Sequence, residues 1–210
     1  ALELLAQGWK VIGIDSVTDY YDVRMKHKRL AMLKKYQAFS FYKINIAKYA
    51  VLEKILKKEK PDEIIHLAAQ AGVRYSLTNP WAYIESNELG TLNIFESAKR
   101  LGIKRVIYAS SSSVYGGNTE SPMKESHRTD RQLAVYGVTK KANEALAHAY
   151  NHLYGIEMIG LRFFTVYGTW GRPDLALFKF VKNILAGKPI HVYNRGNRKQ
   201  NIFLLTKDYE

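Results

Sequence analysis

The chain has 210 residues, of which 47% are apolar, and its 32 basic and 19 acidic residues give a formal net charge of +13. This length fits one globular domain, or one domain and the beginning of a second. The chain has no cysteine, which excludes disulfides, thiolate zinc sites and thiol nucleophiles. The positive charge favours phosphate-bearing partners. Because the basic residues are scattered and no nucleic-acid motif is present, we expect nucleotides and no nucleic acid.

No segment approaches the roughly 18 uninterrupted apolar residues of a membrane span. The first residues, ALELLAQGWK, lack the basic start of a signal peptide. We therefore expect a cytoplasmic protein with no membrane partner. His148 and His152 have the spacing of metal ligands on a helix, but no acidic helper motif accompanies them, so we expect no metal site.

Short apolar segments alternate with helical ones along the chain, which is typical of parallel βαβ units in an α/β fold. After a helix that stops at Gly8, strands are expected at residues 11–14, 39–44, 63–67, 105–110 and 156–164. Helices are expected at residues 22–35, 51–58, 81–101, 136–154 and 174–185. The strand at 63–67 is expected to be buried. Gly102 is expected to end the helix at 81–101.

A Tyr-x-x-x-Lys pair is formed by Tyr136 and Lys140. One helical turn places the ammonium beside the phenol, where it can stabilise a phenolate and reach a cofactor ribose. The same spacing also fits an exposed helix face. A strand ends in four serines, and Ser111 precedes Tyr136 by 25 positions. A strand-end hydroxyl could therefore meet the phenol at the carboxyl edge of the sheet, where ligands bind in this fold class.

Seven segments occur in the order VIGIDSVTDYYD, HLAAQAGVRYS, NELGTLN, YASSSSVYGG, YGVTKKANE, LRFFTVYG and WGRPDLALFKF. In these motifs the sequence resembles the extended short-chain dehydrogenases/reductases of the NAD-dependent epimerase/dehydratase family. The resemblance implies a Rossmann-type doubly wound parallel sheet at 1–168, which binds NAD, and the beginning of a nucleotide-sugar substrate domain at 169–210. It also implies that the glycine-rich loop and the first strand, about 20 residues, precede Ala1 in an active form.

The resemblance implies the following cofactor-binding residues. Asp15 would bind the adenosine ribose, although a helix N-cap is the alternative for this residue. Lys140 would bind the nicotinamide ribose, and Asn87 would lie near the active site, unless it is an ordinary mid-helix asparagine at a dimer seam. The remaining candidates are a small-residue turn against the dinucleotide and a residue that lines the nicotinamide: Ala68, Ala69, Gln70 and Phe164.

The implied reaction is epimerisation at C4 of a UDP-sugar through a 4-keto intermediate. Tyr136 would be the general base, and Ser111, with Ser113 as a second candidate, would hydrogen-bond the sugar oxygen. Ser112 and Ser113 stand where the 4,6-dehydratases of this family carry an Asp-Glu pair, so dehydration is not expected. Ser112 and Thr165 are expected to contact the substrate.

Arg172, in the segment GRPD, suggests which sugar is bound, because a guanidinium can hold a carboxylate with two hydrogen bonds. Its segment resembles the UDP-glucuronate epimerases more than the UDP-galactose ones, so conversion of UDP-glucuronate to UDP-galacturonate is expected. The alternative is an arginine that pairs with Asp174.

Three other readings stay open. The chain could be a truncated or degenerate paralogue that acts as a binding or subunit-pairing module through the helices at 81–101 and 136–154. It could be another nucleotide-sugar epimerase of the same family, or a nucleic-acid binder that uses the +13 charge. For an active enzyme we expect a homodimer through the same two helices.

Overall fold

A computed structural model describes residues 1–118 and 120–189 of the chain. The chain divides into two compact units, Ala1–Val166 and a second that begins at Tyr167, and each is described by itself. Within the described residues, no helix combines the length and the apolar character needed to cross a membrane.

Two parallel strands form the first sheet of unit 1. β1 (Val11–Asp15) pairs with β2 (Phe39–Lys43) from the register Val11↔Phe39 to Asp15↔Lys43. The short helix α1 (Leu2–Ala6) precedes β1, and Gly8 ends it with a φ of +86°. The crossover between the strands is α2 (Val23–Leu33), which begins where the Asp22 carboxylate accepts from the Arg24 amide.

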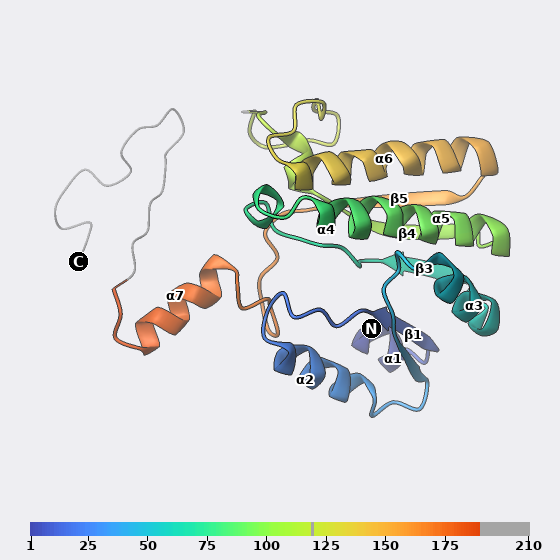
Figure 1. Ribbon diagram of the computed structural model, residues 1–210, viewed down its shortest axis with the longest axis horizontal. Helices are drawn as coiled ribbons and strands as arrows, with labels where there is room; N and C mark the ends of the chain where they lie inside the picture. Colours follow the sequence, from blue (N-terminus) through green and yellow to red (C-terminus); the bar gives the residue numbers. More distant parts are fainter. Residues whose placement is uncertain (119, 190–210) are drawn as a thin grey trace. The chain divides into compact units, whose positions relative to one another are not determined.

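Three further strands form a second parallel sheet in the order β3-β4-β5, with bounds Glu63–His66, Arg105–Ser111 and Glu157–Phe163. Helices α3 (Tyr49–Glu59), α5 (Gly90–Leu101) and α6 (Val135–Tyr154) pack beside one another, with α5 in the middle. Figure 1 shows α5 and α6 running along the strands. Their inner faces and the strands enclose the core, in which Phe95 meets the rings of Tyr108 and Tyr150.

The helix predicted at 81–101 exists, but it is not a single α-helix. It begins as α4 (Trp81–Tyr83), continues as the π-helix Ile84–Leu89, and becomes α5 at Gly90. Hydrophobic periodicity does not distinguish a π-turn from an α-turn, so the π-helix could not be predicted from the sequence. Gly102 ends α5 as predicted, with a φ of +70°. Two 3₁₀ helices, Tyr75–Leu77 and Ser112–Tyr115, were also not predicted.

The prediction that the strand at 63–67 is buried was wrong for one of its faces. Ile64 and His66 point toward the core, whereas Ile65 is 48% exposed and Leu67 is 58% exposed. The sequence is apolar on both faces, but in unit 1 the helices α5 and α6 contact this sheet and pack their core only against the side that carries Val106 and Tyr108. A continuous apolar run indicates burial on both faces only when both faces are covered.

The α/β class predicted from the alternation of elements is confirmed, and all strand pairs in the described residues are parallel. The strands form two sheets, however, because β1 and β3 are not paired with each other. In the described residues the pairing is therefore interrupted between β1 and β3.

In the second unit, α7 (Ala176–Leu185) begins two residues later than the expected start at 174. Leu175 is its N-cap and Ala186 its C-cap. The assignment of residues 169–210 to a substrate domain stays a prediction, and residues 190–210 lie outside the described part of the chain.

Gly160 provides a test of the packing between β4 and β5. It stands opposite Tyr108 in the register, and a Cβ at this position would lie 2.5 Å from the buried Tyr108 hydroxyl oxygen. Because the ring has little room to move, we expect Gly160→Ala to lower the free energy of unfolding by about 1–3 kcal/mol in urea denaturation. The control is Gly117→Ala, whose Cβ would have an ordinary contact at 3.7 Å; equal losses in the two variants would contradict the packing argument.

Candidate active site at the carboxyl edge of the second sheet

The serines at the end of β4 lie against the first turn of α6. The Ser111 hydroxyl oxygen accepts from the Ser113 amide at 3.1 Å and so begins the 3₁₀ helix Ser112–Tyr115. A Cβ on Gly137 would lie 2.8 Å from the Ser113 carbonyl oxygen, so the absence of a side chain at 137 lets the two elements approach closely. The structure therefore brings the predicted serines and the start of α6 to one edge of the sheet.

Tyr136 and Lys140 lie one turn apart on α6, as the spacing predicts. The Lys140 Nζ donates to the Ala109 carbonyl oxygen at 2.7 Å, and the side chain is only 3% exposed. Burial lowers the pKa of Lys140 to about 8. The half-buried Tyr136 ring packs edge-on against Tyr83, with centroids 6.0 Å apart. The pair is thus not an exposed helix face.

A hollow of about 90 Å³ lies at the carboxyl ends of β1, β2 and β3. Four of its lining residues were predicted to bind the cofactor: Asp15, Ala68, Ala69 and Gln70. It is also lined by three residues that were not predicted to bind the cofactor: Lys26, Asn45 and Ser86. The Asp15 carboxylate accepts from the Val17 amide at 2.6 Å. Val17 has a φ of +51°, which is rare for a β-branched residue. Residues with such strained backbone angles cluster at functional sites.

Asn87 is completely buried within the π-helix and holds the Gln70 turn on both sides. Its Oδ1 accepts from the Gln70 amide at 2.8 Å, and its Nδ2 donates to the Gln70 carbonyl at 3.0 Å and to the Thr139 hydroxyl at 3.0 Å. These bonds tie the turn to the residue before Lys140. A direct contact of Asn87 with a cofactor stays a prediction.

The other predicted site residues are partly or largely exposed. In unit 1, Ser112 is half-buried, Thr165 is exposed, and the 60% exposed Phe164 lies 6.4 Å from the Tyr115 ring. In the second unit, Arg172 forms a bidentate ion pair with Asp174, the alternative considered for it. The binding roles of these residues remain predictions. Across the described residues, no group of three or more acidic or histidine side chains could hold a metal ion.

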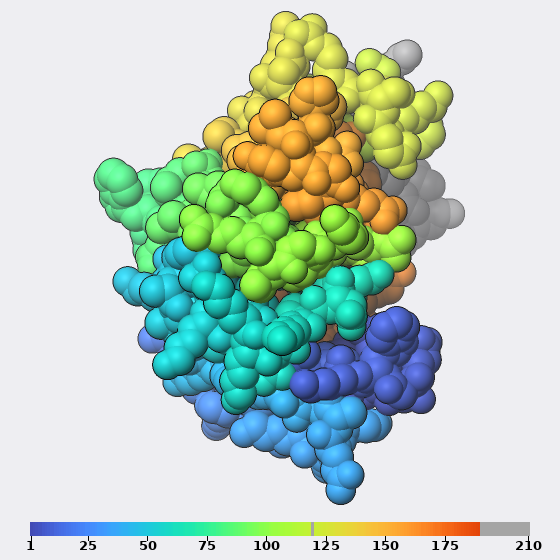
Figure 2. Space-filling model, turned by 90° about the vertical axis from the view of Figure 1, so that its right-hand side faces the viewer, coloured from blue at the N-terminus to red at the C-terminus, as the bar shows by residue number. Residues whose placement is uncertain are grey.

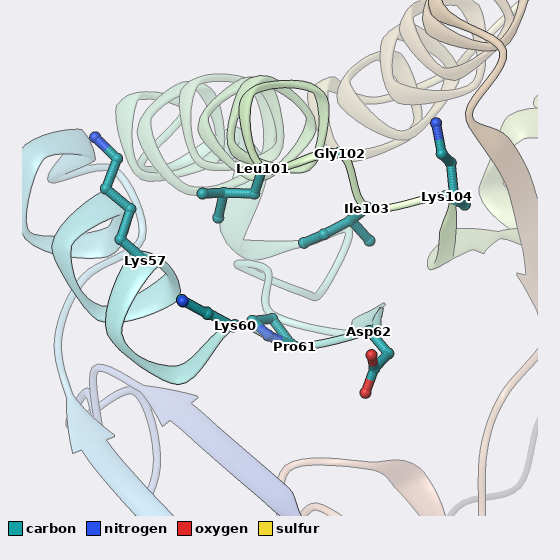
Figure 3. A pocket seen from close by; sticks show the side chains of 8 residues that line it. All are labelled: Lys57, Lys60, Pro61, Asp62, Leu101, Gly102, Ile103 and Lys104. Atoms are coloured by element: carbon teal, nitrogen blue, oxygen red, sulfur yellow. The ribbon is translucent and has the colours of Figure 1, made fainter.

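A larger hollow of about 510 Å³ lies at the opposite, amino edge of the second sheet. It is formed where the chain leaves α3 and α5 and enters β3 and β4. Figure 2 faces this edge, with the segments around α3, α5 and the end of α6 in a row. Figure 3 shows the side chains of Lys57 and Lys104 on opposite sides of the hollow, with both ammonium groups turned away from Pro61 and Asp62, so they do not converge on one point. This hollow shares no residue with the predicted site.

Sequence reasoning also missed Glu144 and Arg162. The Arg162 guanidinium donates two hydrogen bonds of 2.8 and 3.0 Å to the Glu144 carboxylate, which also accepts from the Ser110 hydroxyl. A sequence signal was present for one of them. Tyr136, Lys140 and Glu144 are spaced at successive intervals of four residues, so the three lie along one side of α6.

Parallel strands that carry a hollow, a Tyr-x-x-x-Lys helix and strand-end serines at their carboxyl ends define a Rossmann-type nucleotide-binding fold. The sequence matches the model of the NAD dependent epimerase/dehydratase family over residues 1–204, and the chain belongs to this family. The family resemblance and the fold predicted from the sequence are therefore confirmed.

Individual relatives are similar over most of the chain. An uncharacterized protein of Methanocaldococcus jannaschii is 58% identical over 91% of the chain and 59% of the relative. A probable UDP-glucuronate 4-epimerase of Rhizobium meliloti is 45% identical over 96% of the chain and 59% of the relative. The crystal structure of UDP-glucuronic acid 4-epimerase from Bacillus cereus, in complex with UDP-glucuronic acid and NAD, superposes with a TM-score of 0.82 and 33% identity. That match covers 90% of this chain and 59% of the crystallised chain, so the chain spans about three fifths of these relatives.

Burial of Lys140 predicts a specific dependence of stability on pH. Below about pH 8 the ammonium is charged in both the folded and the unfolded chain, so the full cost of burying it is present. Between about pH 8 and about 10.4, the ordinary pKa of lysine, the folded protein releases this proton first, so stability rises. We expect wild type to gain roughly 2–3 kcal/mol relative to Lys140→Met across this range.

The measurement is urea denaturation of both proteins at pH 7, 8, 9 and 10, which cancels the other titrating groups. A difference between the two proteins that does not change with pH would contradict the burial of a charged Lys140.

Proposed function

We propose that the protein is an NAD-dependent enzyme that inverts the hydroxyl at C4 of a UDP-sugar, with UDP-glucuronate as the substrate and UDP-galacturonate as the product. The observation that carries the proposal is the position of Tyr136 and Lys140 on α6, against the serines at the end of β4. The names of the Rhizobium meliloti and Bacillus cereus relatives support both the reaction and the sugar.

The residues of the first hollow suit an adenosine ribose and a pyrophosphate-linked nucleotide. Asp15 presents a carboxylate that can accept from the two ribose hydroxyls. Ala68 and Ala69 keep side-chain bulk away from the turn, which lets backbone approach a ligand. When bound, NAD supplies the acceptor and then the donor of the hydride at C4.

Tyr136 would take the proton from the 4-hydroxyl of the sugar and return it to the product. No side chain in the described part of the chain hydrogen-bonds its hydroxyl. The Lys140 ammonium, one turn away, stabilises the phenolate, and its bond to the Ala109 carbonyl holds it in place. Ser111 would donate to the sugar oxygen while charge develops on it. Inversion follows when the 4-keto sugar presents its other face.

The expected homodimer would use the helices at 81–101 and 136–154, whose surfaces carry the exposed side chains of Trp81, Leu92, Val138 and Leu153. Burial of such apolar side chains is what stabilises a subunit interface. The dimer and a cytoplasmic location remain predictions.

The test of the mechanism is Tyr136→Phe in the complete gene product. Removal of the phenol takes away the general base and leaves the ring, so turnover of UDP-glucuronate should fall by about 10²-fold or more. The affinity for NAD, measured by titration calorimetry, should change little. Near-full turnover by Tyr136→Phe would refute the proposed mechanism, and absence of epimerisation by wild type with either UDP-glucuronate or UDP-galactose would refute the function.

The test of substrate charge is Arg172→Ala. If Arg172 leaves Asp174 to hold the sugar carboxylate, the variant should bind UDP-glucuronate roughly 2–4 kcal/mol more weakly and UDP-glucose about as well as wild type. Asp174→Asn is the matched control, because it breaks the same ion pair and keeps the guanidinium. Equal losses on both sugars would assign Arg172 a structural role.

A further inference from the structure

Arg162 of β5 is bonded to two other parts of unit 1. Its Nε and Nη2 donate to the carboxylate of Glu144 on α6 at 2.8 and 3.0 Å. Its Nη1 donates to the Glu125 backbone oxygen at 2.9 Å and to the Tyr115 hydroxyl at 3.3 Å, and the guanidinium carbon lies 5.0 Å from the centroid of the Tyr115 ring. One side chain therefore ties β5 to α6 and to the segment between β4 and α6.

Glu144 extends these contacts to β4. Its Oε1 also accepts from the Ser110 hydroxyl at 2.7 Å, and the buried Ser110 directly precedes Ser111. Glu144 follows Lys140 by one helical turn on the same side of α6. The carboxylate thus joins the helix that carries Tyr136 to the strand end that carries the serines.

The ion pair is largely shielded from water, since the side chain of Arg162 is 20% exposed and that of Glu144 is 13% exposed. Burial alone would raise the pKa of Glu144, but hydrogen bonds from Arg162 and Ser110 bring it below its ordinary value. The attraction within such a pair does little more than offset the free-energy cost of removing the two charges from water. Its bidentate geometry does fix the distance and the angle between the elements that it joins.

We infer that Arg162 and Glu144 are positioning residues of the reaction centre, which hold the serines of β4 and the 3₁₀ helix after them at a fixed distance from Tyr136 and Lys140. They touch neither the sugar nor the cofactor in this role. The inference rests on the proposed function for its kinetic test, and the structural contacts give it a second test that is independent of activity.

The kinetic test is Arg162→Lys in the complete gene product. Lysine keeps the charge but cannot bond Glu144 with two parallel donors while it also reaches Tyr115 and the Glu125 carbonyl. We expect kcat to fall by about 10²-fold because a small misplacement of reacting groups is costly. The KM for UDP-glucuronate and the Kd for NAD should stay within about twofold of wild type. A kcat within twofold of wild type would overturn the inference.

The double variant Arg162→Met with Glu144→Met separates positioning from stability. Apolar residues of similar volume can restore stability where a buried ion pair is removed, but they leave Ser110, Tyr115 and the Glu125 carbonyl without their bonds. We expect kcat to remain low even where the melting temperature recovers. Recovery of kcat in the double variant would show a merely structural role.

Arg105→Met is the matched control. Arg105 lies on β4 and pairs with Glu63 and Glu157 of the neighbouring strands, so it also joins separate elements, but in solvent and at the opposite edge of the same sheet. The kcat of the Arg105→Met variant should stay within about twofold of wild type. A loss equal to that of Arg162→Lys would mean that any such bridge affects turnover, and the inference would fall.

The second test is hydrogen exchange of the Gly117 amide, which donates to the Arg131 carbonyl beside the 3₁₀ helix. Arg162→Met should speed its exchange at least tenfold relative to Arg105→Met, because the segment loses its tie to β5. Unchanged exchange would overturn the inference. If wild type does not epimerise UDP-sugars, the proposed function fails by itself, and this exchange experiment alone decides the inference.

Discussion

The attachment of α6 to the carboxyl end of β4 is the constraint on which the candidate site depends. Three contacts make it: the Lys140 ammonium on the Ala109 carbonyl, the Ser110 hydroxyl on Glu144, and the close approach of Gly137 to the Ser113 carbonyl. Each of the three contacts involves a proposed catalytic residue or its neighbour in the sequence. Apolar packing of α6 on the sheet could slide by a fraction of an ångström, whereas directed hydrogen bonds between buried groups have one good geometry.

Buried polar contacts also fix the part of the candidate site that is proposed to bind the cofactor. Asn87 bonds both the amide and the carbonyl of Gln70 and reaches Thr139 on α6, so one side chain joins the turn after β3 to the helix that carries Tyr136 and Lys140. It stands in a π-helical turn. Such turns are rare and recur at functional sites, where a locally wider helix redirects side chains. Asn87 and the pair of Glu144 and Arg162 thus hold α6 from two sides.

The two edges of the second sheet differ in the burial of their charged and polar side chains. At the amino edge, Arg105 bridges two glutamates in solvent, and the side chains around the larger hollow do not converge. At the carboxyl edge, the charged and polar groups are buried and bonded to backbone or to one another. Exposed ion pairs contribute little and leave geometry loose, so the edge with the buried network is the one that can hold reacting groups.

Local sequence determined the order and type of the strands and the longer helices, because alternating apolar segments, Gly8 and Gly102 act over a few residues. The family motifs, the Tyr136–Lys140 spacing and the turn at Ala68 to Gln70 were also readable, since each is a fixed offset within one element. Tertiary structure decided the rest. It divided the strands into two sheets and left Ile65 and Leu67 exposed. It also brought Glu144, Ser110 and Arg162 together from three elements. Burial and hydrogen-bond partners depend on which distant segments cover a residue, and no local pattern in the chain records that.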